Sequence, residues 1–174
     1  SPVTIAHSPV GCAVVDRFVE VEAKLSPSAS VARARLVFRA AEAEAWYWVA
    51  MTAEGGGENY RGYVPKPQDK LKAFDYYIEA NTPAFEESRT AETRVDVIPA
   101  RGTCSKGSLA KSLGGVASRL VISPLSGGAA LPAGFASTGL VAAGSSSATA
   151  AAGSVAAGGG GGVGAGVVVA GVAA

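Results

Sequence analysis

Short runs of alternating apolar and polar residues dominate the first part of the chain. Residues 18–25 place Val, Val, Ala and Leu on one side and Glu, Glu and Lys on the other. Residues 33–39 repeat the pattern, with Ala34, Leu36 and Phe38 on one side and three arginines on the other. A period of two residues is that of a β-strand with one buried and one wet face. Both runs are therefore predicted to be strands.

Five further segments carry the same alternation or are rich in strand-favouring residues, and turn-forming residues separate them. Residues 40–45 favour helix by propensity, but we prefer a turn or a short helical turn between two strands there. Seven short strands, each with one wet face, predict an antiparallel sandwich of two sheets. The five segments are residues 3–6, 46–51, 60–64, 74–80 and 93–98.

Charged residues end well before the chain does. All 15 Lys and Arg and all 14 Asp and Glu residues lie at or before Arg119, the last acid is Asp96, and the formal net charge is +1. The chain therefore divides into a mixed-charge body (1–100), a basic connector (101–122) and an uncharged Gly/Ala-rich segment (123–174). A near-neutral charge gives no reason to expect a nucleic-acid partner, because such proteins need surplus cations against phosphate.

The sequence shows no catalytic or metal-ligating pattern. One His and two Cys are too few for a zinc site with Cys/His spacing. His7 stands alone near the start of the chain, where we expect a surface or strand-end residue. The acidic pairs in the predicted loops carry no mark of acid–base partners, and the glycines at 55–57 lack the Lys-Ser/Thr of a phosphate loop. We therefore expect no enzyme activity, no cofactor, no metal and no small-molecule substrate.

One stretch of the body resembles a known family. Leu71, Tyr76, Ile78 and Ala80 are similar to the Leu…Tyr-x-Val-x-Ala stretch of fibronectin type III and related immunoglobulin-like domains. The resemblance extends over about residues 1–100. It implies a seven-stranded sandwich in which the tyrosine, here Tyr76, forms a corner by hydrogen-bonding to the backbone.

The body is also similar to modules common in bacterial envelope proteins, which often begin near a His-x-Pro such as His7-Ser8-Pro9. It departs from the antibody pattern because its two cysteines, Cys12 and Cys104, flank the strands. In a sandwich of this kind the first and last strands are neighbours, so a disulfide between their ends is geometrically feasible. Such a bond would imply an oxidising compartment. The alternative is two free, unrelated thiols.

The aromatic residues of the run 46–51 cannot all face one side of a strand. Trp46 and Trp48 are two residues apart and share a face, which we expect to be the core. Tyr47 then points the opposite way and is expected to contact a partner.

The connector carries an apolar stripe at helical spacing, which predicts a short amphipathic helix. Basic residues beside the stripe favour a segment on a membrane surface, and a helix packed back on the sandwich is the equal alternative. Gly114-Gly115 weakens either helix by roughly 1 kcal/mol per Gly. The stripe is Leu109, Leu113, Val116 and Leu120, and the basic residues are Lys106, Lys111 and Arg119.

Glycines recur every four residues near the C-terminal end. Residues 153–174 are long enough, as one helix, to span the ~30 Å core of a bilayer, and with residues 129–144 they suggest a helical hairpin. Small residues four apart let helices approach closely in lipid, as in glycine-zipper segments. The alternative is a flexible spacer. The packing residues are Gly158, Gly160, Gly162, Gly164 and Gly166.

These features combine into a functional hypothesis. We expect a non-enzymatic docking subunit of a bacterial cell-envelope assembly, such as a secretion complex, whose Gly-rich segment anchors and oligomerises it. Its partners would be other envelope proteins or copies of itself. The start at Ser1 without a signal peptide fits a removed one. A basic flank normally marks the cytoplasmic side of a membrane helix, so an exported sandwich favours the outer membrane or periplasm over the inner membrane. The alternative is a secreted surface or adhesion module with a spacer tail.

Overall fold

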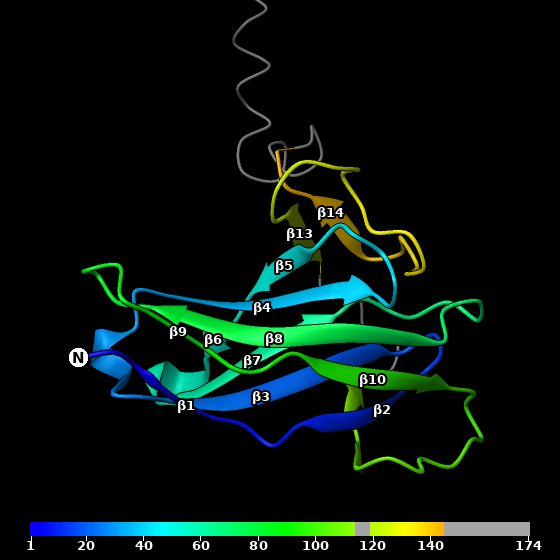
Figure 1. Ribbon diagram of the computed structural model, residues 1–174, viewed down its shortest axis with the longest axis horizontal. Coiled ribbons are helices and arrows are strands. Elements are labelled where there is room, and N and C mark those ends of the chain that lie inside the picture. The colour runs from blue at the N-terminus through cyan, green and yellow to red at the C-terminus, as the bar shows by residue number, and fades with distance from the viewer. Residues whose placement is uncertain (114–118, 145–174) are drawn as a thin grey trace, which may run out of the picture.

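The computed structural model describes residues 1–113 and 119–144, and over these residues the protein is mainly β (Figure 1). Its strands form a five-stranded and a nine-stranded sheet. The five-stranded sheet has the order β1 (Thr4–Ala6), β3 (Phe18–Ser26), β7 (Asn59–Val64) and β6 (Thr52–Ala53), with β12 (Ser112–Leu113) also paired to β3. Two short 3-10 turns, η1 (Ser28–Ser30) and η2 (Glu54–Gly56), lie between strands.

The nine-stranded sheet begins at β11 (Ser108–Leu109) and β2 (Val10–Val14) and continues through two long strands, β8 (Ala73–Asn81) and β4 (Arg33–Ala40). The remaining order is β10 (Thr93–Ile98), β8, β4, β5 (Tyr47–Ala50), β13 (Leu120–Pro124) and β14 (Leu140–Ala142), with β9 (Glu87–Arg89) paired to the end of β8. Most neighbours are antiparallel, but β2 runs parallel to both β10 and β11, and β13 runs parallel to β14.

The core lies between the two sheets. Alternation along β3 turns Val21 and Leu25 inward, and alternation along β4 turns Leu36 and Phe38 toward them, and all four side chains are buried. Gly62 on β7 packs closely against the facing sheet, since a Cβ there would lie 2.9 Å from the Met51 side chain and 3.3 Å from that of Leu36. Each fully buried Leu or Phe side chain contributes roughly 1.5–3 kcal/mol, so this layer supplies the main stabilisation of the sandwich.

The seven strands predicted from the alternation are all present, so the mainly β prediction is confirmed. Residues 40–45 form a turn and not a helix: the Ala43 N–H donates to the Ala40 carbonyl at 3.0 Å, and Glu42 adopts a positive φ of 69°. The turn is required because β4 and β5 are antiparallel neighbours and the chain has to reverse between them.

The amphipathic helix predicted around residues 109–120 is wrong wherever the structure describes it. Leu109 lies in β11 beside β2, and Leu120 begins β13 beside β5, while residues 114–118 lie outside the described residues. The reason is that β2 and β3 leave open backbone donors and acceptors. The Ala110 N–H donates to the Cys12 carbonyl at 2.8 Å, and the Glu20 N–H donates to the Lys111 carbonyl at 2.9 Å.

The strands after residue 100 therefore extend the same two sheets. The sandwich continues beyond the domain boundaries predicted from the sequence after residues 100 and 122. Phe135 is buried in the same core, with its ring 5.3 Å from that of Phe38 in an edge-on arrangement. Residues 129–144 contain the buried Phe135 and strand β14. They do not form the first helix of the predicted hairpin.

Within the described residues no helix is long and apolar enough to cross a bilayer. The five packing glycines predicted between Gly158 and Gly166 lie outside the residues that the structure describes, as does the whole of the spanning helix predicted over 153–174.

Candidate interaction surfaces

Strand β8, which with β3 is one of the two longest strands of the described residues, is buried on both of its faces. Its inner residues belong to the core, but the outward-facing Asp75, Tyr77 and Glu79 are also only 4–5% exposed. Val37 on the outer side of β4 is fully buried, and it lies in register between Tyr77 and Trp48. The outer side of the nine-stranded sheet therefore carries a second packed layer, which we call the outer layer.

Trp46 and Trp48 belong to this outer layer, so the prediction that they fill the core is wrong. Tyr47 is the residue that points inward: it is buried in the core, and its hydroxyl donates to the Ala129 carbonyl at 2.9 Å. The cause is the strand register, which pairs Tyr47 with the inward-facing Phe38. Because its hydroxyl has a hydrogen-bond acceptor in the Ala129 carbonyl, Tyr47 can lie in the core, and it is not available as the predicted partner contact.

Arginine side chains cover the aromatic rings of the outer layer. The guanidinium of Arg39 lies 4.4 Å from the Trp46 ring centre, and that of Arg35 lies 5.1 Å from the Trp48 ring centre. The Trp46 ring meets Tyr77 edge-on at 5.2 Å. Partly desolvated cation–π contacts each contribute about 1 kcal/mol, so the arginines act as a lid over the aromatic rings.

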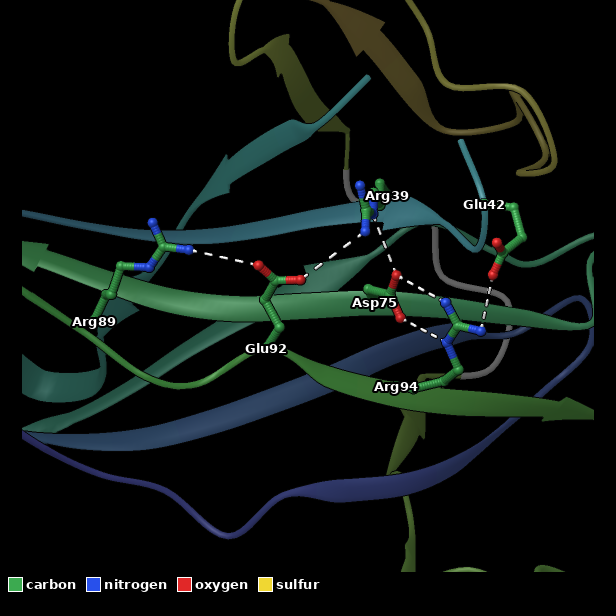
Figure 2. A network of polar contacts seen from close by, with 6 residues as sticks. All are labelled: Arg39, Glu42, Asp75, Arg89, Glu92 and Arg94. Atoms are coloured by element: carbon green, nitrogen blue, oxygen red, sulfur yellow. Dashed lines mark hydrogen bonds and ion pairs between the residues drawn. The ribbon is translucent and has the colours of Figure 1, made fainter. Parts of the chain in front are cut away.

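Of these two arginines, Arg39 is held by the acidic residues that Figure 2 shows. Asp75 on β8 lies in register between Arg39 on β4 and Arg94 on β10. The Arg94 Nε lies 2.8 Å from one oxygen of Asp75, and the Arg39 Nε lies 3.2 Å from the other. Hydrogen bonding from Arg94, opposed by burial and aided by Arg39, lowers the pKa of the Asp75 carboxyl.

The network continues to both sides of Asp75 in Figure 2. Glu42 from the β4–β5 turn reaches Arg94 at 3.1 Å, and Glu92 bridges Arg39 and Arg89 at 4.0 and 3.8 Å. Because each of these arginines already faces a carboxylate, the outer layer is electrostatically self-contained. It offers a stiff, partnered surface and no free cation for an anionic ligand.

Tyr76 ties β8 to the first strands of the chain. Its hydroxyl accepts the Val10 N–H at 2.9 Å and lies 2.6 Å from Nε2 of His7. Nδ1 of His7 is 2.7 Å from the Glu22 carbonyl, which only accepts, so the proton sits on Nδ1 and Tyr76 donates to Nε2. Burial lowers the pKa of His7 and raises that of Tyr76.

The tyrosine does bond to the backbone, as its resemblance to the family implies. The bond, however, runs to a strand 66 residues upstream and not to a nearby corner. Tyr76 therefore acts as a tether between strands.

Cys12 and Cys104 form a disulfide in the structure, with Cα atoms 5.7 Å apart. Cys12 lies in β2, and Cys104 follows β10, the strand that pairs with β2 in parallel. The bond spans 92 positions of the sequence and so closes a loop that contains most of the sheets.

The predicted basic residues lie nearby but on no helix. Lys106 pairs with Asp96 at 3.5 Å and Lys111 pairs with Glu22 at 3.4 Å. Arg119 is exposed just before β13. Two of the three cations are thus engaged by acids of the sandwich.

The turn between β8 and β9 presents a feature that the sequence analysis did not single out. Phe85 is 89% exposed and has a positive φ of 65°. The available signal was a large aromatic residue in the otherwise small and polar stretch 82–87, between two predicted strands.

Comparisons with known proteins find little. No protein-family model matches the chain, and no curated protein matches it. Among solved structures, the SrpA adhesin of Streptococcus sanguinis is similar at a TM-score of 0.37 and 16% identity, over 57% of this chain and 58% of that chain. A likeness of this size carries no functional conclusion. Within the described residues no cluster of three or more His, Cys, Asp or Glu side chains is placed to hold a metal ion.

Proposed function

We propose that this chain is a non-enzymatic, extracytoplasmic binding module of the surface or adhesion type. The observation that carries the proposal is the disulfide between Cys12 and Cys104. Structural disulfides persist in oxidising compartments outside the cytosol and are rare inside it. The described residues supply a stiff two-sheet scaffold, and scaffolds of this kind commonly present loops and edges to partners.

The strand order supports an immunoglobulin-like or fibronectin-like module. The sheet order β1-β3-β7-β6 corresponds to the ABED sheet of that architecture, and β10-β8-β4-β5 corresponds to its G, F, C and C′ strands. Two differences remain: the two tryptophans lie on the outer layer, and the disulfide joins the flanks of the sandwich and not its middle strands. Fold alone does not determine a partner. The proposal therefore states where the protein acts, outside the cytoplasm, and that it acts by binding, and it names no partner.

Thiol trapping in intact cells tests the compartment. Cells that produce the full chain are treated with an alkylating reagent before lysis, and the mass of the protein is measured with and without prior reduction. We expect no alkylation of Cys12 or Cys104 without reductant, and degradation of the chain when protease is added outside the cell envelope. Alkylation of both cysteines together with full protection from protease would contradict an extracytoplasmic location.

A second candidate is the envelope-assembly subunit anchored through its C-terminal segment. The observation that favours it is the four-residue spacing of Gly158, Gly162 and Gly166 in the sequence. Its test is membrane fractionation of the full chain and of a variant that ends at Gly144, because β14 and the buried Phe135 must be kept. A large membrane particle for the full chain and a soluble monomer for the variant would support anchoring. Two soluble monomers would contradict it.

A further inference from the structure

We propose that the turn over residues 82–87 docks a protein partner, with Phe85 inserted into an apolar pocket rimmed by cationic side chains. The inference rests on the proposed function in one respect, since it assumes that the module binds a macromolecule. The disulfide and the strand order do not indicate which residues contact the partner or what chemistry the partner presents. The turn at 82–87 indicates both.

Phe85 is unfavourable in the isolated protein for two separate reasons. Its side chain is 89% exposed, although burial of a Phe is among the larger sources of stabilisation. Its backbone has a φ of 65°, a left-handed conformation that is unfavourable for an L-residue with a bulky side chain and that Gly or Asn adopts readily. Gly or Asn at this position would relieve that backbone strain and expose no aromatic ring. A strained and exposed aromatic residue is the kind of outlier from which a function is inferred.

The turn holds Phe85 in a fixed place. The Phe85 N–H donates to the Thr82 carbonyl at 2.9 Å, and the Thr82 N–H donates to the Glu86 carbonyl at 3.0 Å. The buried Thr82 also uses its hydroxyl oxygen to accept the Glu86 N–H at 3.1 Å. The aromatic ring is therefore presented from a closed ring of hydrogen bonds at the end of the most buried strand. An anchor that is already ordered loses little conformational entropy on binding.

The position of the turn makes it accessible. In Figure 1 the green turn between β8 and β9 extends beyond the ends of the sheets, on the side of the N-terminus. Among the residues that the structure describes, the other exposed large apolar side chains, Leu109 and Val121, are about half covered and lie within strands. Single half-covered apolar residues of that kind are ordinary on protein surfaces.

The neighbours of Phe85 indicate the partner. Pro83 and Ala84, which precede Phe85, are exposed and small. Glu86 and Glu87, which follow it, are exposed acids. Glu86 also lies 3.3 Å from the amino group of Ser1. An apolar ring beside two carboxylates matches a pocket with a cationic rim. Lipid insertion is disfavoured because anionic membrane surfaces attract cations and repel acids. A symmetric contact between two copies would bring four carboxylates together.

The test uses the full chain with p-benzoyl-phenylalanine, a photoreactive phenylalanine analogue, at position 85 in the cells that produce it. Illumination is expected to give one discrete protein adduct, identified by mass spectrometry. The same analogue at Lys70, in a loop between β7 and β8, serves as the control and should not give that adduct. The identified protein is then purified, and its binding to the wild-type chain and to variants is measured.

Phe85→Ala is expected to weaken the measured binding at least tenfold, in the range of an interface anchor. Phe85→Leu should lose less, and Val121→Ala, the matched change at another exposed apolar residue, should lose nothing measurable. Glu86→Gln and Glu87→Gln together should slow association and reduce its dependence on salt. The Tm of the Phe85→Ala variant should equal that of the wild type, because its side chain makes no packing contribution.

Several results would overturn the proposal: no adduct at position 85, an adduct with lipid or with a second copy of the chain, equal binding by Phe85→Ala, or a clearly lowered Tm of that variant. None of these results bears on the thiol-trapping test. Oxidised cysteines with no adduct at 85 would remove this docking site alone. Alkylated cysteines in a chain that is fully protected from protease, with an adduct at 85, would remove the proposed compartment alone.

Discussion

The middle of β8 and the turn that follows it differ in how far their side chains are buried and partnered. In the middle of the strand each outward-facing group has a partner: Asp75 has two arginines, Tyr77 has a ring and a guanidinium, and Glu79 accepts from Arg35 at 2.9 Å. A few residues later Phe85 is exposed and strained. Sequences tend to satisfy local rules everywhere except at functional sites, so the contrast marks the turn as the place where selection acted on something other than stability.

Of the substitutions that we propose, removal of the Asp75 carboxylate should lower the stability of the protein most. Asp75→Ala leaves Arg39 and Arg94 facing each other without the carboxylate, and the expected loss is about 3 kcal/mol of unfolding free energy, measured by guanidinium denaturation. Asp75→Asn keeps the shape and part of the hydrogen bonding and should cost less. A loss below about 1 kcal/mol for Asp75→Ala would mean that the ion pairs of Asp75 contribute no more to stability than solvent-exposed salt bridges do.

The acid dependence of the same residue sharpens the test. Since the folded-state pKa of Asp75 is lowered, the stabilisation from its carboxylate is complete above the ordinary pKa of about 3.9 and is lost as the pH falls through the lower folded value. Wild type should therefore lose stability steeply below about pH 4, and Asp75→Asn should lose less over the same range. Parallel curves for the two proteins would contradict this assignment.

The aromatic part of the outer layer should give the next largest effect. Trp46→Ala removes the edge-on contact with Tyr77 and uncovers Arg39, for an expected cost of about 2 kcal/mol in the same denaturation measurement. Trp46→Phe keeps a ring beneath the guanidinium and should recover about half of that loss. Equal losses for the two variants would show that the ring does not contribute through these contacts.

The difference between the two regions of β8 could be predicted only in part. Alternation identified the strand and its inner face, because a period of two residues follows from strand geometry. It did not predict that Asp75, Tyr77 and Glu79 are buried, because their cover comes from arginines on neighbouring strands. Pairing register decides which side chains meet, and it depends on long-range contacts that local pattern does not contain.

The same limit explains the other errors. In the run 46–51 every residue near the turn is aromatic, so alternation could not tell which side was inner until the pairing of Tyr47 with Phe38 was known. The stripe from Leu109 onward has helical spacing, but the open edges of β2 and β3 capture its backbone as short strands. The exposure of Phe85 had no periodic signal, since a turn has no period.

His7 provides a smaller effect in a separate pH window. Because burial lowers its folded-state pKa, the stabilisation is complete above the ordinary value of about 6.5 and declines as the pH falls below it. A protonated imidazole would donate from Nε2 to the Tyr76 hydroxyl, whose own proton would then lose its acceptor. Wild type should lose stability between about pH 7 and 5, where Asp75 does not titrate. His7→Gln should abolish that slope, and a slope that persists would assign it to another group.

The smallest expected effect on stability concerns Phe85, and its sign is the informative part. Phe85→Asn places a residue that tolerates the left-handed conformation at φ 65° and removes an exposed ring, so the free energy of unfolding should stay the same or rise by up to about 1 kcal/mol. Glu42→Asn, at a φ of 69° in the β4–β5 turn, is the matched control. There the relief of strain competes with loss of the Arg94 ion pair, so the gain should be smaller. A loss of stability for Phe85→Asn would mean that the ring supports the fold, and the two regions of β8 would then no longer differ in kind.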